Sequence, residues 1–183
     1  MKTDNCIALL RQMVAIPSES QNEQAFAEFL ANFLHEELSM ETQLQHVDGK
    51  SYNVIGRWSS GAHGKKLILG GHIDTVPPTL RWETDPYQLC TRGDELHGLG
   101  AADMKGGLAA QLTVLRRFKE ENAVFNADIE FVGLSDEERH SIGAHAYVDL
   151  MRQQNALRKK NFFLMGEPHF DNIVIGATGK VLL

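Results

Sequence analysis

The sequence has few cysteines, and their spacing excludes two classes of site. Only Cys6 and Cys90 occur among the 183 residues, and no C-x-x-C pair is present. Thiolate zinc sites and dithiol redox sites, which use such pairs, are therefore excluded. Two cysteines so far apart are more typical of reduced thiols in a cytoplasmic protein than of a disulfide, and we expect a cytoplasmic location.

The chain also lacks long apolar segments and an excess of positive charge. The apolar residues near the N-terminus are interrupted by Arg11 and Gln12, so they predict neither a signal peptide nor a membrane-spanning helix. The formal net charge is -6. This balance argues against nucleic acid and against an anionic membrane surface as partners. The 43% of hydrophobic and 23% of charged residues are instead those of a soluble globular protein.

Apolar spacing along the chain predicts helices that alternate with strands. Asp4 and Ser141 are expected to cap the first and the last helix. The expected helices cover residues 4–14, 21–37, 107–119 and 141–153. The expected strands cover residues 41–47, 53–58, 66–70, 127–134, 161–167 and 172–177. This alternation indicates the α/β fold class, with a sheet that contains parallel segments.

Polar side chains follow three of the predicted strands at the point where each strand ends. The run "KKLILGG" leads to His72 and Asp74, "DIEFVGLS" leads to the acidic residues 136–138, and "NFFLMG" leads to Glu167. A fourth segment, "LHGLGAADMKGG", places Asp103 just before a helix. Because ligands of open α/β sheets bind beyond the carboxyl ends of the strands, we expect these side chains to converge at one edge.

Two other glycine-containing patterns do not support a nucleotide site. The segment "GLGAAD" lacks the third glycine of the dinucleotide-binding motif. The segment "GATGK" lacks the leading glycine and the final Ser or Thr of a phosphate-binding loop. We therefore expect the converging carboxylates to bind something other than a nucleotide.

The chemistry of the expected cluster indicates a divalent metal ion. Carboxylates gathered at one place repel one another unless a positive group lies among them. Oxygen ligands with a single imidazole suit zinc, manganese or cobalt in a hydrolytic site. Asp74 follows His72 by two residues, so its side chain can hold the second ring N–H of the histidine. We interpret Gly70 and Gly71 as residues that leave room for metal and substrate.

Glu137 and Glu138 are adjacent, so their side chains need not face the same way. One of them can bind the metal while the other stays free to accept a proton from a bound water. The residues alone leave open which of the two does which.

As a set, these motifs resemble the N-terminal half of a dizinc amidohydrolase and exopeptidase family. The family includes acetylornithine deacetylase, succinyl-diaminopimelate desuccinylase, aminoacylase and glutamate carboxypeptidase. The matching pieces, in the family's order, are "GHIDTVPP", W-x-x-D-P-Y from Trp82 to Tyr87, "LHGLGAADMKGG", "SDEERHSIGA" and "GEP". The resemblance implies a three-layer α/β/α metallopeptidase catalytic domain (phosphorylase/hydrolase-like), with a mixed sheet and helices on both faces. It also implies that residues 1–183 are the N-terminal part of that domain, truncated before a lid or dimerisation domain and a C-terminal part.

The resemblance implies two divalent metal ions, most often zinc, with cobalt or manganese as alternatives. It makes His72 and Glu167 ligands of the first ion, Glu138 a ligand of the second, and Asp103 a bridge between them. In the family, the second ion also takes a histidine from near the end of a much longer chain. None of the eight histidines lies after His169, so we expect the second metal site to be incomplete.

For catalysis, the resemblance makes Glu137 the general base and Asp74 the residue that orients His72. The implied reaction is hydrolysis of the amide bond of an N-acyl amino acid, as in acetylornithine deacetylase or succinyl-diaminopimelate desuccinylase, which belong to amino-acid biosynthesis. A C-terminal exopeptidase or dipeptidase acting on short peptides is an alternative that these motifs do not separate. Another alternative is a chain that binds metal without turnover. The full-length form is expected to be a homodimer.

Overall fold

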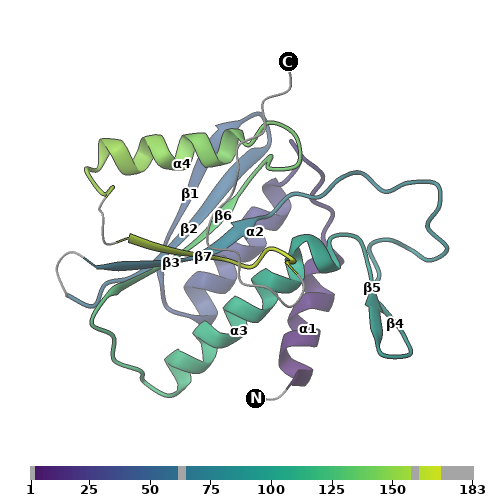
Figure 1. Ribbon diagram of the computed structural model, residues 1–183, viewed down its shortest axis with the longest axis horizontal. Helices are drawn as coiled ribbons and strands as arrows, with labels where there is room; N and C mark the ends of the chain where they lie inside the picture. Colours follow the sequence, from purple (N-terminus) through teal and green to yellow (C-terminus); the bar gives the residue numbers. More distant parts are fainter. Residues whose placement is uncertain (1–2, 62–64, 158–160, 170–183) are drawn as a thin grey trace.

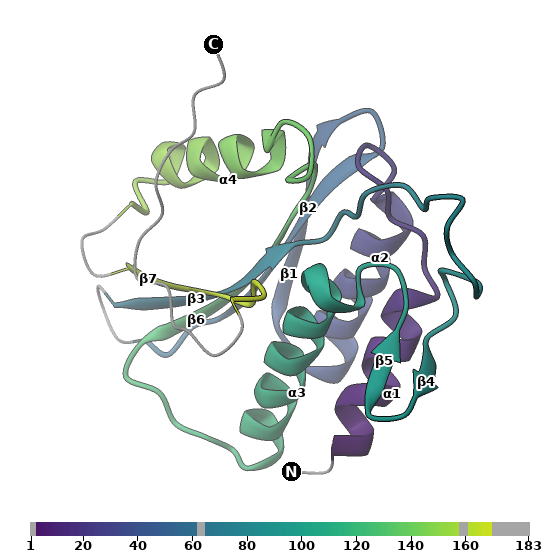
Figure 2. The same cartoon turned by 45° about the vertical axis from the view of Figure 1, so that its right-hand side comes forward.

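In the computed structural model, which describes residues 3–61, 65–157 and 161–169, a mixed β-sheet lies between two layers of helices (Figures 1 and 2). The sheet consists of β1 (Glu41–Asp48), β2 (Ser51–Trp58), β3 (Lys66–His72), β6 (Asp128–Leu134) and β7 (Asn161–Met165). The helices are α1 (Thr3–Val14), α2 (Gln24–Asn32), α3 (Gly106–Glu120) and α4 (Ile142–Gln153). Two π-helical turns, η1 (Phe33–Glu37) and η2 (Ala101–Lys105), extend α2 and precede α3.

The order of the strands in the sheet is β1-β2-β6-β3-β7. The pairs β1–β2 and β2–β6 are antiparallel, whereas β6, β3 and β7 run parallel to one another. The carboxyl ends of these three parallel strands therefore meet at one edge, as the sequence predicted. A separate hairpin, β4 (Cys90–Arg92) with β5 (Glu95–His97), lies outside this sheet.

Apolar residues on both faces of the sheet hold the three layers together. Helices α1, α2 and α3 cover one face, and α4 covers the other (Figures 1 and 2). On the first face, Phe26 and Leu30 of α2 are fully buried in the main core. On the second face, Tyr147 and Met151 of α4 pack in a smaller cluster that includes Val132 of β6. The expected three-layer α/β/α fold with a mixed sheet is therefore confirmed.

The predicted helix over residues 21–37 begins later and is less regular than expected. It starts at Gln24, and its last turn widens into η1. The preceding Glu23 is fully buried, where it accepts hydrogen bonds from the Ser51 hydroxyl and from the backbone N–H groups of Gln21 and Asp136. The side chain of Glu23 thus attaches the N-terminal segment to the start of β2 and to the loop after β6.

The two predicted helix caps are wrong. Helix α1 already begins at Thr3, so Asp4 lies within its first turn instead of at the N-cap position. Ser141 does precede α4, but it adopts a left-handed φ of 53° and its side chain makes no capping hydrogen bond. Its hydroxyl is instead 3.4 Å from the carbonyl oxygen of Glu137. The strand predicted over residues 172–177 lies outside the described residues.

The interpretation of Gly70 and Gly71 as room for metal and substrate is also wrong. Gly70 has a φ of 142°, and a Cβ there would lie 1.8 Å from the backbone oxygen of Val132. A Cβ on Gly71 would lie 2.0 Å from the side chain of Met104. The absence of side chains is therefore required for packing of β3 against β6 and against the segment that carries Asp103.

Two expectations about cysteines and membranes can be compared with the structure. Cys6 and Cys90 are both free thiols. Within the described ranges, none of the helices combines the length and apolarity needed to cross a membrane.

Candidate metal centre

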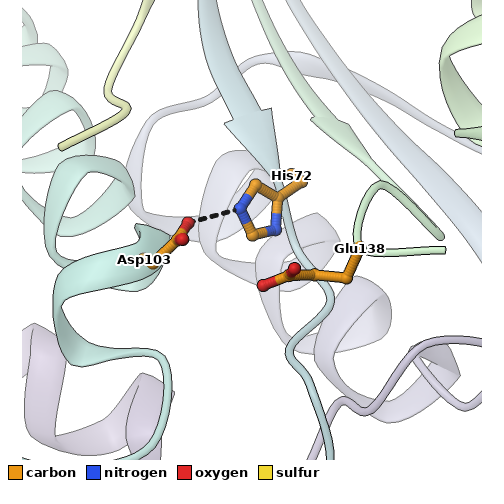
Figure 3. A group of neighbouring side chains, drawn as sticks. All are labelled: His72, Asp103 and Glu138. Atoms are coloured by element: carbon orange, nitrogen blue, oxygen red, sulfur yellow. Dashed lines mark hydrogen bonds and ion pairs between the residues drawn. The ribbon is translucent and has the colours of Figure 1, made fainter. Parts of the chain in front are cut away.

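Three side chains from separate parts of the chain converge beyond the end of β3 (Figure 3). His72 is the last residue of β3, Asp103 lies in η2 before α3, and Glu138 lies in the loop between β6 and α4. One ligand atom from each residue lies within 4.8 Å of the other two. Of these atoms, His72 Nε2 and Asp103 Oδ1 lie 2.8 Å apart.

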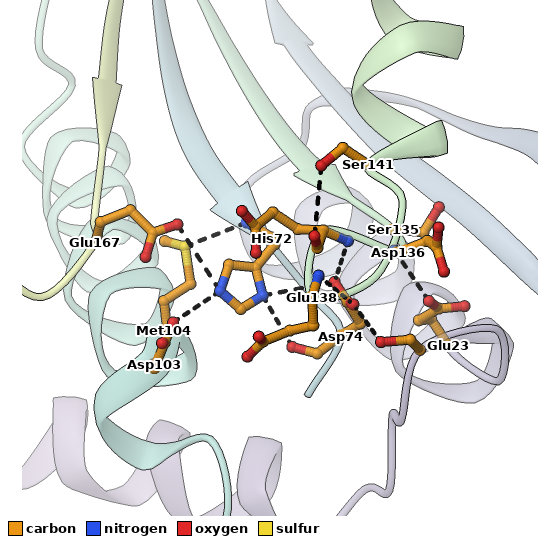
Figure 4. A network of polar contacts seen from close by, with 12 residues as sticks. Glu23, His72, Asp74, Asp103, Met104, Ser135, Asp136, Glu138, Ser141 and Glu167 are labelled. Atoms are coloured by element: carbon orange, nitrogen blue, oxygen red, sulfur yellow. Dashed lines mark hydrogen bonds and ion pairs between the residues drawn. The ribbon is translucent and has the colours of Figure 1, made fainter. Parts of the chain in front are cut away.

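Glu167 approaches the same histidine nitrogen from the end of β7 (Figure 4). Its Oε1 atom lies 3.8 Å from His72 Nε2. The loop that carries it is attached to β3, because Gly166 N–H donates to the carbonyl oxygen of Gly70 at 3.2 Å. The structure therefore brings all four predicted metal ligands to one edge of the sheet.

Asp74 lies behind the cluster and holds the acidic loop in place (Figure 4). Its carboxylate is buried and accepts backbone hydrogen bonds from Glu137 at 2.9 Å and from Glu138 at 3.1 Å. The hydroxyl of Ser20 donates a third hydrogen bond at 2.7 Å. These three bonds fix the backbone of the acidic loop relative to the end of β3.

His72 is held mainly by the backbone of Asp74. Its Nδ1 atom lies 2.9 Å from the carbonyl oxygen of Asp74 and 3.5 Å from the carboxylate Oδ1. The prediction gave this contact to the carboxylate, whereas the carbonyl is the closer partner. Because a carbonyl oxygen only accepts, Nδ1 carries a hydrogen, and the neutral imidazole of a metal-bound His72 would then direct its Nε2 lone pair to a cation beside Asp103 and Glu167.

The surroundings of the cluster shift the pKa values of His72, Glu138 and Glu167. Burial lowers the pKa of His72, but hydrogen bonds to Asp74 and Asp103 and the charge on Glu167 outweigh this effect and raise that pKa to about 10. Burial raises the pKa of Glu138, and repulsion from Asp103 raises it further. Burial likewise raises the pKa of Glu167, against the attraction of His72. These carboxylates are therefore stabilised by positive charge among them, which a divalent cation would supply.

The pKa of Asp74 shifts in the opposite direction. Burial raises the pKa of its carboxyl group, but hydrogen bonds from His72, Ser20 and the backbone of Glu137 and Glu138 outweigh burial and lower that pKa. Asp74 is thus held as a carboxylate by donors that surround it.

The two adjacent acidic residues of the loop have different surroundings. The side chain of Glu138 is half-buried in the cluster, whereas Glu137 is exposed to solvent. Glu137 is joined to the site through its backbone N–H, so its carboxylate is left available to other groups. This difference matches two separate tasks for the two side chains.

Two residues that support the site were not predicted from the sequence. Ser20 follows the first helix in "PSES", a segment too short to show any periodicity. Lys105 is buried, and its Nζ donates to the carbonyl oxygens of Met13 at 3.0 Å and Ile16 at 2.8 Å. These bonds join the turn that carries Asp103 to the end of α1. A lysine just before an apolar helix was the only sequence signal for this role.

Comparison with known proteins agrees with this arrangement. The family described as Peptidase family M20/M25/M40 matches residues 68–178. Acetylornithine deacetylase of Erwinia tasmaniensis is 35% identical over 91% of this chain and 44% of its own length. Succinyl-diaminopimelate desuccinylase of Coxiella burnetii is 30% identical over 94% of this chain and 47% of its own length. The chain thus spans less than half the length of these curated relatives.

Solved structures show the same fold. Human carnosine dipeptidase 1 superposes with a TM-score of 0.77 at 22% identity, over 94% of this chain and 39% of that chain. The M20 family metallo-carboxypeptidase Sso-CP2 of Sulfolobus solfataricus superposes with a TM-score of 0.76 at 21% identity, over 89% and 37% of the two chains. Since the family match extends from β3 through the end of β7 and covers more than half of the sequence, the chain belongs to the peptidase family M20/M25/M40.

Proposed function

We propose that this chain binds divalent metal and carries the catalytic groups for hydrolysis of the amide bond of an N-acyl amino acid. The convergence of ligand atoms from His72, Asp103 and Glu138 within 4.8 Å is the observation that supports it most directly. One imidazole among carboxylates is a donor set that suits zinc, with cobalt and manganese as alternatives.

The contacts suggest how the ligands divide between two ions. His72 Nε2 faces Asp103 at 2.8 Å and Glu167 at 3.8 Å, so these three residues would hold the first ion. Glu138 would hold the second ion together with Asp103. Because the second ion takes fewer ligands from the described residues, we expect it to bind more weakly.

Glu137 is proposed as the general base. When bound, the metal ions would acidify water and polarise the amide carbonyl. The exposed carboxylate of Glu137 would accept the proton of the attacking water and then deliver it to the leaving amine. Asp74 would position both groups, since its carbonyl holds His72 and its carboxylate holds the loop of Glu137.

The relatives favour deacylation as the reaction. Proteins named acetylornithine deacetylase and succinyl-diaminopimelate desuccinylase are 30% to 35% identical to this chain. The structures whose names describe peptidases, among them the human dipeptidase at 22%, are less similar in sequence. We therefore propose small N-acyl amino acids as substrates, in cytoplasmic amino-acid biosynthesis, and a homodimer as the full-length form.

Zinc binding tests the ligand assignment. Equilibrium dialysis of the chain is expected to show one zinc bound more tightly than a second. His72→Ala should abolish the tight site, whereas His169→Ala should leave it unchanged. Two equally tight zinc ions in the unsubstituted chain would contradict the division of ligands proposed above.

The adjacent glutamates offer a matched pair of variants for the base. In the full-length form, Glu137→Gln is expected to retain zinc and to lose turnover by about two orders of magnitude or more, because it removes a proton acceptor and not a ligand. Glu138→Gln is expected to lose zinc affinity as well. If the two variants exchanged these properties, the assignment within the acidic loop would be wrong by one residue.

A second candidate function, metal binding without turnover, follows from the openness of the site. The side chain of Asp103 is 56% exposed, so the described residues leave water in contact with the metal ligands. Remote contacts that would position the amide are then few, and turnover should be low. Release of free amine from N-acetylornithine and N-succinyl-diaminopimelate measures this directly. Turnover near the ordinary ~10 per second of enzymes would exclude the second candidate.

A further inference from the structure

A cavity of about 360 Å³ lies directly beside the metal centre. It shares Glu138 with the metal-ligand cluster, so a molecule held in it would have one end next to the proposed reaction centre. The residues that line it are Glu19, Ser20, Val76, Pro77, Glu138 and Arg139. Arg139 contributes the positive charge among these lining residues.

Among the described residues, the guanidinium of Arg139 has one hydrogen-bond partner. The side chain is exposed, and its Nη1 donates one hydrogen bond to the amide oxygen of Gln21 at 3.0 Å. Among the residues that the structure describes, no carboxylate forms an ion pair with it. An arginine carries five N–H donors, so most of its capacity faces solvent and the cavity.

The backbone on both sides of Arg139 is fixed. Before it, the acidic loop is held by the carboxylate of Asp74. After it, the carbonyl oxygen of Asp136 accepts the N–H groups of His140 at 3.2 Å and Ser141 at 2.6 Å. Arg139 therefore stands at a defined position next to a proposed metal ligand, which is what recognition of one end of a substrate requires.

The two acidic residues of the cavity already have other partners. Glu19 accepts a hydrogen bond from the hydroxyl of Tyr87, and Glu138 faces His72 and Asp103 in the metal-ligand cluster. Ser20 donates its hydroxyl to Asp74, and the rest of the wall is apolar, formed by Pro77 and by Val76, which is 46% exposed. A cavity with an apolar wall and a guanidinium that no carboxylate of the described residues neutralises suits a short aliphatic chain that ends in a carboxylate.

We propose that Arg139 is a specificity-determining residue that binds a carboxylate of the substrate while the scissile amide lies at the metal centre. This inference rests on the proposed function and narrows the substrates to N-acyl amino acids with a free carboxylate near the amide. Two sources supply that group: the α-carboxylate of the amino acid, or the terminal carboxylate of a dicarboxylic acyl group such as succinyl.

Calorimetric titration of the zinc-loaded chain with three ligands separates these sources. The ligands are N-acetyl-L-ornithine, its α-carboxamide, and the α-carboxamide of N-succinyl-L-ornithine. Arg139→Ala is expected to weaken binding of one carboxylate-bearing ligand by about tenfold or more, the effect of a lost charge-assisted hydrogen bond. Binding of the N-acetyl carboxamide should stay unchanged. Arg139→Lys should retain part of the affinity, because it keeps the charge and loses the planar fork.

Arg152→Ala is the matched control, because Arg152 is an exposed arginine on the last turn of α4, bound to Asp149. It should affect none of the three ligands. Equal loss for the carboxylate and carboxamide ligands on Arg139→Ala, no loss for either carboxylate ligand, or failure of the unsubstituted chain to bind any carboxylate ligand would overturn the inference. Zinc content measured on the same samples distinguishes a failure of this inference from a failure of the proposed metal centre. Full zinc without discrimination by Arg139 refutes this inference alone, whereas absence of zinc refutes the metal centre.

Discussion

Strands β6 and β7 have similarly apolar sequences but opposite surroundings. In β6, "DIEFVGL", the residues from Ile129 to Gly133 are buried between β2 and β3. In β7, "NFFLM", the residues 162–165 are between 47% and 65% exposed at the edge of the sheet. An apolar run thus predicts that a strand can be buried, while its place in the sheet decides whether the described residues bury it.

The difference extends to the proposed metal centre, because each strand leads to a proposed ligand. Glu138 follows a central strand and a loop held by Asp74. Glu167 follows an edge strand whose attachments include the Gly166–Gly70 hydrogen bond and a 3.1 Å bond from Gln111 to the carbonyl oxygen of Leu164. Glu138 is therefore held next to a central strand, whereas Glu167 is held next to an edge strand.

The largest expected effect comes from removing a core side chain of β6. Phe131 is fully buried in the main core, so Phe131→Ala should lower the free energy of unfolding by about 3–5 kcal/mol. The matched substitution on β7, Phe163→Ala, should cost below about 1 kcal/mol, because that ring is 53% exposed. Urea denaturation compares the two. Equal losses would show that β7 is buried in solution.

A buried carboxylate of β6 should give an effect that depends on pH. Glu130 accepts hydrogen bonds from Arg57 at 2.7 Å, from Lys66 at 2.9 Å and from the hydroxyl of Tyr147. Burial raises the pKa of Glu130, but these bonds, with Tyr147 first, outweigh it and lower that pKa below its ordinary 4.5. The stabilisation is therefore present above about pH 4.5 and is lost as the pH falls through the lower pKa of the folded state.

Glu130→Gln tests this by removing the charge while keeping the size of the side chain. It should lower the free energy of unfolding by about 3 kcal/mol at neutral pH, since it leaves the half-buried Arg57 and Lys66 without a buried counter-charge. The difference in unfolding free energy between the variant and the unsubstituted chain should narrow as the pH falls below 4.5. Urea denaturation midpoints of both proteins across this pH range measure the difference in stability. A difference that stayed constant would contradict the lowered pKa of Glu130.

The smallest effect on stability, and the clearest on association, is expected at β7. Phe162 and Phe163 point to opposite faces of an edge strand, where exposed apolar side chains favour contact with other chains. We predict that the unsubstituted chain self-associates as its concentration rises, and that replacing both residues by serine suppresses this. Light scattering over a concentration series checks it. An unsubstituted chain that stays monomeric over the whole concentration series would refute the prediction.

Much of this fold could be predicted from local pattern. The helix and strand periods placed α1, α3, β3 and β6 within a few residues of their observed bounds. The presence of parallel strands followed from the alternation of helices and strands, whereas the order β6-β3-β7 was not predicted. What the pattern could not show was which strand lies at the edge, because an apolar run has the same composition in either place.

The site was predictable where ligands follow strands, and not where a contact depends on distant segments. His72 and Glu167 were recognisable because each follows an apolar run. The use of the Asp74 carbonyl, the hydroxyl of Ser20 and the buried amine of Lys105 depends on segments brought together only by folding. Gly70 was misread for the same reason, because the atom that excludes a side chain there belongs to another strand.

The carboxylate of Asp74 has a consequence for the entropy of metal binding. It accepts hydrogen bonds from Ser20 and from the acidic loop, which are 54 and 63 residues away in the chain. The conformational freedom of that loop is therefore lost when the sheet forms and not when a cation arrives. At the proposed metal centre, one ion could then replace another without reordering of the backbone around Glu137 and Glu138, so the exchange of ions would depend on the ligand side chains.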